Sequence, residues 1–191
     1  MLLTEVLNFN IFMRLKMIAL VFVLGAFTCF SQELVQDKTA SEITFTIKNF
    51  GFNVPGNFNQ FIVSSNFSTR NLKGSFLNAK ISVASIFTDS EARDKHLLEV
   101  DYFNIKKYPN IIFESIAIEK ITPSKYLLKG FITIKGIKKR VETTLNVTTS
   151  KTTVTFLTDF SLNRRDFGVG GSSFVLSKEV NIKMKYVATK N

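Results

Sequence analysis

Apolar and polar residues alternate along most of the chain after residue 41, which is the pattern of β-strands with one buried face. In Glu42–Phe50, for example, Ile43, Phe45 and Ile47 fall on one face and polar residues on the other. The segment Ile111–Ile121 differs, because it is apolar on both faces for most of its length. The predicted strands are Glu42–Phe50, Asn57–Ser68, Ser75–Phe87, Ile111–Ile121, Tyr126–Lys135, Val141–Val147, Thr152–Asn163 and Glu179–Ala188.

Turn-forming residues separate these strands. They are Pro55-Gly56, Thr122-Pro123-Ser124, Lys135-Gly136 and Ser150-Lys151. Short connections and half-polar strands exclude a parallel α/β sheet. Eight strands of this length are long for a compact sandwich and favour a closed barrel, whose interior accommodates one elongated ligand. The sequence therefore predicts an all-β fold, an eight-stranded antiparallel barrel in a single domain.

One segment departs from the strand pattern, between Arg93 and Ser115. Asp89 is in position to cap a helix N-terminus, and Glu91 places an acidic residue in the first turn. Residues then recur at helical spacing, so we predict one short helix. The predicted stripe on this helix consists of Ala92, His96, Val100 and Phe103.

Residues 1–31 have the features of a secretory signal peptide. A basic region precedes the apolar run Met17–Phe27, which is shorter than the roughly 20 residues that span a bilayer, and small residues follow it. Met13 is a possible start of translation. We therefore expect residues 32–191 to form the mature domain, located in the periplasm or secreted.

Cysteine content and charge narrow the classes of function. Cys29 is the only cysteine and lies in the signal segment, so the mature domain has no disulfide, thiol nucleophile or thiolate metal site. Acylation of Cys29, as in a lipoprotein, is the less favoured alternative. The net charge of +10 would suit nucleic acid, but predicted export argues against that partner. Solubility is the favoured explanation of the positive charge, and attraction to an anionic membrane surface or an anionic ligand is the alternative.

His96 is the only histidine in the chain. Without a second histidine or a cysteine beside it, a metal site would need carboxylates alone. Asp94 is two residues away and lies on another helical face, so a catalytic triad built from this segment is disfavoured. We expect His96 to form a hydrogen bond that seats the helix on the barrel.

Two further charged segments invite interpretation. Arg164 and Asp166 precede a glycine-rich turn, and they would either pair with Asp94 and Arg93 across the barrel mouth or leave Arg164 to bind a ligand's head group. The basic hairpin tip Lys135–Arg140 is usually only a solvated turn, and attraction to a membrane is its functional alternative.

The segment Arg93-Asp94-Lys95-His96-Leu97, with Asp101-Tyr102-Phe103 and Tyr108–Ser115 after it, resembles the signature of the YceI-like family. These are exported, lipocalin-like, polyisoprenoid-binding bacterial proteins. Three further blocks agree in order and span essentially the whole mature chain. They are Phe45-Thr46-Ile47-Lys48 with Gly51-Phe52 and Gly56-Asn57-Phe58, then Gly130–Ile137, and Asn163–Gly168.

The resemblance implies an extended, lipocalin-like eight-stranded barrel with a helix packed at one end. It also implies a long hydrophobic tunnel for an isoprenoid quinone, a polyprenyl phosphate or a similar amphiphile such as a fatty acid derivative. The family often has a histidine soon after the first strand, where this chain has Asn49. The candidate ligand-binding residues are Phe45, Phe61, Phe67, Arg93, Asp94, His96, Phe103, Phe113, Phe131, Phe156, Phe160, Arg164, Asp166 and Phe167.

The sequence thus favours a non-enzymatic carrier or sequestering protein for a long isoprenoid or related lipid. No catalytic residue, metal or cofactor is expected apart from the bound lipid. One alternative is an enzyme that acts on a lipid head group through His96, Asp94 and Arg164. Another is an envelope interaction module that uses the basic turn at Lys138–Arg140. A membrane surface and a second copy of the chain remain open as partners.

Overall fold

The computed structural model describes residues 34–190, so the predicted signal peptide and Met13 lie outside the described residues. The described residues form eleven strands in one sheet, one α-helix and two 3₁₀ turns. Their bounds are β1 (Leu34–Gln36), β2 (Glu42–Asn49), β3 (Phe52–Phe58), β4 (Phe61–Asn66), β5 (Phe76–Ser82), η1 (Val83–Ser85), β6 (Ile86–Phe87), α2 (Glu91–Leu97), β7 (Asn110–Lys120), β8 (Lys125–Ile134), β9 (Ile137–Thr149), β10 (Thr153–Asn163), η2 (Arg164–Phe167) and β11 (Leu176–Lys190).

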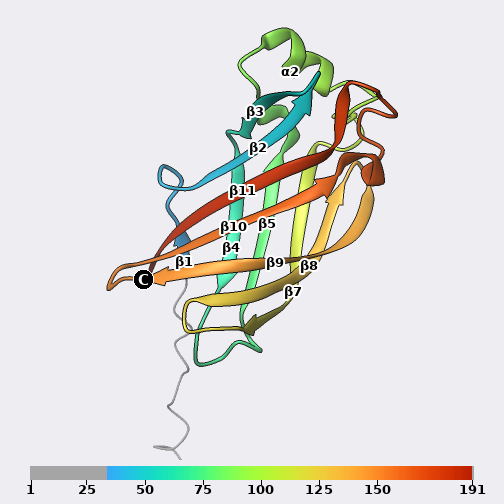
Figure 1. The fold of residues 1–191 in the computed structure, drawn as a ribbon. Helices are drawn as coiled ribbons and strands as arrows, with labels where there is room; N and C mark the ends of the chain where they lie inside the picture. Colours follow the sequence, from blue (N-terminus) through green and yellow to red (C-terminus); the bar gives the residue numbers. More distant parts are fainter. Residues whose placement is uncertain (1–33, 191) are drawn as a thin grey trace, which may run out of the picture. The chain divides into compact units, whose positions relative to one another are not determined.

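The sheet closes on itself through the short strand β1 (Figure 1). β1 pairs with β4 on one side and with the end of β11 on the other, and all pairings are antiparallel. The first part of β11 pairs with β2, β2 with β3, and β3 with β6. Three pairs of consecutive segments, β1 with β2, β3 with β4, and β5 with β6, each occupy a single strand position in the barrel. The eleven segments therefore form a barrel of eight strands. This confirms the predicted architecture.

Strand alternation sets which side chains face the interior. In β8, Tyr126, Leu128, Ile132 and Ile134 are buried, and the residues between them are partly exposed. Gly130 takes the remaining inward position of this strand. The two-residue connection from β8 to β9 has positive φ at Lys135 and Gly136, the geometry that matches the twist of a hairpin.

The predicted turn at Pro55-Gly56 is wrong, because both residues lie inside β3. The β2–β3 hairpin turns earlier, at Phe50 and Gly51, which have φ values of 50° and 82°. Pro55 is tolerated because β3 pairs with β6 only at its last two residues, so much of that edge needs no N–H donor. Gly56 lies directly beneath the ring of Phe45, whose Cζ would be 2.3 Å from an added Cβ.

The predicted helix is present but shorter, and its N-cap is Ser90 rather than Asp89. The Ser90 hydroxyl accepts a hydrogen bond from the amide of Arg93, whereas Asp89 has a positive φ of 60°. Val100 lies beyond the helix and is 64% exposed, so the expected stripe does not continue through it. The helical spacing of apolar residues extends beyond the helix itself, because the backbone hydrogen bonds after Leu97 are those of tight turns.

Candidate functional site

An apolar cavity of about 470 Å³ occupies the half of the barrel beneath α2, here called the hollow half. Its volume lies within the roughly 300–1,000 Å³ typical of small-molecule pockets. Strands from around the barrel line it, together with the segment that contains α2 and the segment between β10 and β11. The apolar residues that line the cavity include Phe45, Phe58, Phe113, Ile132, Val141, Phe160, Leu162, Ile182 and Met184.

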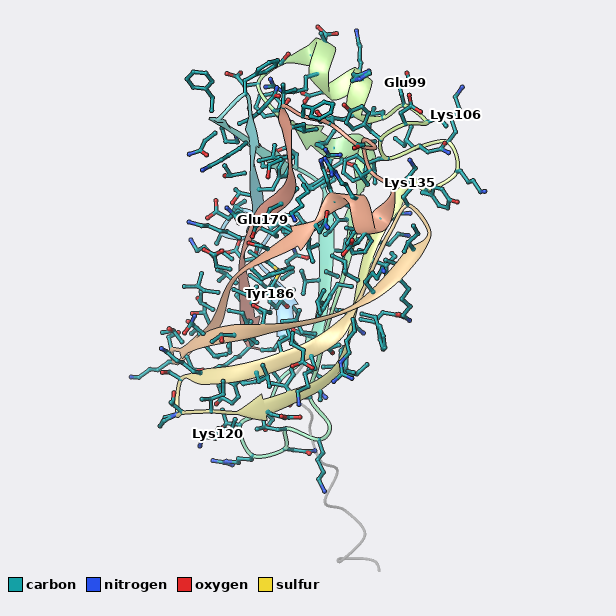
Figure 2. All side chains as sticks on the ribbon, turned by 45° about the vertical axis from the view of Figure 1, so that its right-hand side comes forward. Glu99, Lys106, Lys120, Lys135, Glu179 and Tyr186 are labelled. Atoms are coloured by element: carbon teal, nitrogen blue, oxygen red, sulfur yellow. The ribbon has the colours of Figure 1, made fainter. Side chains whose placement is uncertain are left out.

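The opposite half of the barrel, here called the filled half, is closed by aromatic rings. Phe156 and Tyr186 stack with their centroids 5.3 Å apart, and both are completely buried. Phe67 meets Tyr126 and Phe156 edge-on, at 5.2 Å from each. Figure 2 shows Tyr186 among the strands, with Lys120 at the end of this half and Glu99, Lys106 and Lys135 toward the helix end. These four rings, here called the aromatic floor, fill the interior beyond the cavity, and none of them lines it.

A buried polar pair lies within this aromatic floor. The hydroxyl groups of Tyr186 and Ser65 are 2.9 Å apart and satisfy each other. Burial raises the pKa of the Tyr186 phenol, and the hydrogen bond to Ser65 offsets part of that rise. The phenol therefore stays neutral at physiological pH and serves packing.

The hollow half stays open because phenylalanine rings lie flat against its wall. The ring of Phe45 covers Gly56 on the neighbouring strand, and the ring of Phe113 covers Gly130. A Cβ at Gly130 would lie 2.6 Å from Phe113 Cζ. Because glycine has no side chain, each ring can lie against the neighbouring strand instead of crossing the interior.

The wall of the hollow half separates between β9 and β10. These strands pair only from Val154 to Thr158, and the rest of both strands diverges. At the point of separation, the Thr143 and Thr158 hydroxyl oxygens are 2.8 Å apart. Val141 and Phe160 both line the cavity, one from each separated strand. The separation widens the interior on this side of the barrel.

Of the fourteen candidate ligand-binding residues, the structure places eight on the cavity wall and six elsewhere. The eight are Phe45, Arg93, His96, Phe103, Phe113, Phe160, Arg164 and Phe167. The six are Phe61, Phe67, Asp94, Phe131, Phe156 and Asp166.

Asp166 is exposed within η2, Asp94 belongs to α2, and the four aromatic residues pack elsewhere. Phe67 and Phe156 belong to the aromatic floor, and Phe61 packs against the cores of both halves. The ring of Phe131 contacts the Lys138 ammonium, 5.0 Å from the ring centroid. The sequence does not distinguish phenylalanines that line the cavity from those that pack elsewhere, because the filled and hollow halves of the barrel use the same residue type.

The mouth of the cavity is bordered by α2. Arg93 donates hydrogen bonds to the hydroxyl and the carbonyl of Thr88, and the Thr88 hydroxyl donates to Asp94 at 2.5 Å. The hydrogen bond that seats the helix was expected from His96, but Arg93 and Asp94 make it instead. The His96 ring packs edge-on against Tyr102 with centroids 4.8 Å apart.

Arg164 is buried at the side of the mouth and holds the segment before β11. Its guanidinium donates to the backbone carbonyls of Val169, Gly171, Leu176 and Ser177, at 2.7–3.1 Å. Burial lowers the pKa of this guanidinium, and the neighbouring Arg165 adds to the effect. Of the two alternatives for Arg164, the ion pair with Asp94 is not formed among residues 34–190. At least four of the five N–H groups of the Arg164 guanidinium donate to these carbonyls, so they are not free to bind the head group of a ligand.

The candidate ligand-binding residues did not include the polar residues of the mouth or the aliphatic lining of β11, although Asn49 was noted at a position where the family often has a histidine. Asn49 and Ser173 both line the cavity at its mouth. Ile182 and Met184 line it from β11, and their alternation with Asn181 and Lys183 was the signal that marked this face. The emphasis on aromatic residues obscured that signal.

Residues 34–190 contain neither a cluster of metal-ligating side chains nor a helix that could cross a membrane. The described part of the chain contains no group of three histidine, cysteine or acidic side chains arranged to hold a metal ion. Over the same residues, the one α-helix is too short and too polar to cross a membrane.

Comparison with known proteins places the chain among relatives of the same fold. A UPF0312 protein of Photorhabdus laumondii is 37% identical over 100 residues, which is 52% of each chain, so the matched region spans about half of that relative. BcnA of Burkholderia cenocepacia has a TM-score of 0.77 at 27% identity, over 81% of this chain and 99% of the other. A polyisoprenoid-binding domain of Saccharophagus degradans has a TM-score of 0.67 at 16% identity, over 84% and 99%.

The family model agrees with this likeness and covers the whole barrel. The model of the YceI-like domain matches residues 34–188, from the closing strand β1 to near the end of β11. The motifs around Arg93, Gly130 and Arg164 thus fall within one matched domain that folds as a closed antiparallel barrel around an apolar cavity. The chain belongs to the YceI-like family.

Proposed function

We propose that this protein is a non-enzymatic carrier that holds the apolar chain of an isoprenoid or similar amphiphilic lipid in the cavity. The observation that carries the proposal is the cavity itself, which lies on the helix side of the packed aromatic rings and has a predominantly apolar surface. Each CH₂ group moved from water into such a site contributes about 0.8 kcal/mol. A lipid can therefore bind through its chain with few polar contacts.

The position of the cavity limits how such a ligand would lie. The resemblance implied a long tunnel, but Phe156 and Tyr186 close the interior halfway. A chain would enter from the mouth and end at this floor. Its head group would then lie near Asn49, Arg93 and Ser173, which border the mouth. The polyisoprenoid-binding domain of Saccharophagus degradans shares this fold and supports the same class of ligand.

Other parts of the proposal concern cell location and chemistry. Export to the periplasm or the medium would place the carrier between membranes or outside the cell. We propose that it needs no cofactor and catalyses no reaction. Arg164 and Asp94, two members of the alternative catalytic set, are engaged with backbone carbonyls and with Thr88 respectively. We also propose a second copy of the chain as a partner.

The test is native mass spectrometry of the purified protein before and after incubation with an isoprenoid quinone in detergent. We expect a one-to-one complex. Ile182→Phe places a larger ring in the cavity beside Phe45 and Phe160, and it should abolish uptake. Ile116→Phe enlarges a side chain that is 53% exposed on the barrel surface and should leave uptake unchanged. Equal uptake by the Ile182→Phe variant would contradict the proposal.

A further inference from the structure

Three aromatic side chains at the cavity mouth are exposed to solvent and are here called the aromatic rim. Phe50 is 70% exposed, Phe52 is 77% exposed and Phe174 is 110% exposed. Phe50 and Phe52 belong to the tip of the β2–β3 hairpin, and Phe174 lies two residues before β11. The Phe50 amide donates to the Val175 carbonyl at 2.9 Å, which joins the two segments. Both lie at the same end of the barrel as α2 (Figure 1).

The aromatic rim continues the apolar surface of the cavity. Phe58, Gly56, Val54 and Phe52 occupy the same face of β3, where the ring of Phe45 covers Gly56, and exposure rises from 9% at Phe58 to 77% at Phe52. Phe50 and Val175 line the cavity and are also exposed. An apolar chain that leaves the cavity by this route therefore stays in contact with apolar side chains until it reaches the rim.

Basic residues flank the aromatic rim. The segments 46–54 and 171–178 contain Lys48 and Lys178, and the nearest acidic residue along the chain is the exposed Glu179 beside Lys178. The guanidinium of Arg165 donates to the Ser173 carbonyl at 2.9 Å, beside Phe174. All three cations are exposed, and none of them forms a salt bridge within residues 34–190. Exposed aromatic rings beside unpaired cations are the combination that binds the interface of an anionic bilayer.

We propose that the aromatic rim docks on the surface of an anionic bilayer, with Phe50, Phe52 and Phe174 inserted at the boundary between head groups and acyl chains. The mouth then opens directly into the membrane, and a lipid passes between bilayer and cavity without crossing water. This inference rests on the proposed function, because it gives the route by which the ligand enters. The contact uses the mouth rather than the basic turn at Lys138–Arg140, where Lys138 and Arg140 are paired with Glu114 and Glu142.

Vesicle binding tests the proposal directly. The full chain is expressed, the form that accumulates is purified, and its sedimentation with phosphatidylcholine vesicles containing phosphatidylglycerol is measured. Phe52→Ser with Phe174→Ser removes two rim side chains that do not line the cavity. We expect binding to fall at least about tenfold, given the free energy of burying a phenylalanine. Ile62→Ser with Ile116→Ser removes two exposed side chains from the outer wall and should leave binding unchanged.

A second pair of measurements separates this inference from the proposed function. Uptake of isoprenoid quinone from detergent should be the same for the rim variant and the wild type, whereas transfer from vesicles should be slower for the rim variant. Failure of both proteins to take up quinone from detergent would reject the carrier function, while the vesicle result would still decide the docking surface. Unchanged vesicle binding by the rim variant would overturn the docking proposal.

The vesicle assay also tests the two lysines, and analytical ultracentrifugation tests whether a second copy of the chain covers the rim. Lys48→Gln with Lys178→Gln should weaken binding to vesicles with phosphatidylglycerol and leave the weak binding to pure phosphatidylcholine unchanged. A wild type that is dimeric by analytical ultracentrifugation, with a rim variant that is monomeric, would show that another copy covers the rim and would reject the membrane as its partner.

Discussion

The two halves of this barrel share strands and residue types, yet one is filled and the other is hollow. Strand β10 runs through both and contributes Phe156 to the aromatic floor and Phe160 to the cavity wall. In the filled half, rings from β8, β10 and β11 meet across the interior. In the hollow half, rings lie on Gly56 and Gly130, and the wall separates between β9 and β10. The residue opposite each ring, rather than the ring itself, decides whether the interior is filled.

The largest expected effect compares Phe156 with Phe160 on the same strand. Phe156→Ala leaves a void among fully buried rings and should lower the free energy of unfolding by about 3–5 kcal/mol. Phe160→Ala enlarges an existing cavity and should cost less than half as much. Urea unfolding of the ligand-free proteins measures both values. Equal losses would mean that the two halves are packed alike.

Arg164→Lys should have the next largest effect. Lysine cannot reproduce the planar fork that donates to four carbonyls, so several buried acceptors lose their partners. We expect a loss of about 2–3 kcal/mol in the free energy of unfolding. Hydrogen exchange should also become faster at the amides of Val169 and Gly170, which lie in the segment that Arg164 holds. Arg165→Lys, with an exposed side chain, provides the control.

Gly56→Ala tests whether glycine keeps the hollow half open. The added Cβ would lie 2.3 Å from Phe45 Cζ, so the ring must move off the wall and into the cavity. We expect lipid affinity to fall about tenfold, which is about 1.4 kcal/mol. Adding Phe45→Leu should restore affinity because the shorter side chain clears the methyl group. Unchanged binding by Gly56→Ala alone would show that the ring position does not set the space available.

The smallest expected effect concerns the polar pair in the filled half. Tyr186→Phe removes the partner of the Ser65 hydroxyl and should cost about 1 kcal/mol at neutral pH. Because burial raises the pKa of the Tyr186 phenol above its ordinary value of 10.0, this group favours folding below that pH, and the contribution is lost as pH rises further. Unfolding curves between pH 8 and 11 should therefore be less steep in pH for the variant. An unchanged dependence would mean that the phenol ionises without unfolding.

Much of the architecture was predictable from local patterns. The alternation of apolar and polar residues identified the eight strands of the barrel, and Lys135-Gly136 identified a hairpin turn. Both features depend on residues that are close in sequence. A closed barrel was predicted, but the strand that closes it was not predictable in this way. Strand β1 has only three residues, and its pairing with both β4 and β11 depends on partners far away in the chain. Pro55-Gly56 was assigned to a turn because its role in β3 also depends on non-local neighbours.

The candidate site divides along the same line. The sequence by itself determined that the chain forms a barrel, that phenylalanine is abundant on its strands and that the segment around Arg93 marks the YceI-like family. Only the tertiary structure decided that Phe156 fills the interior while Phe45 borders a cavity, and that Arg164 binds backbone carbonyls instead of an anion. The physical reason is that periodicity specifies the face on which a side chain lies, whereas its contacts depend on the residue that the opposite strand places against it.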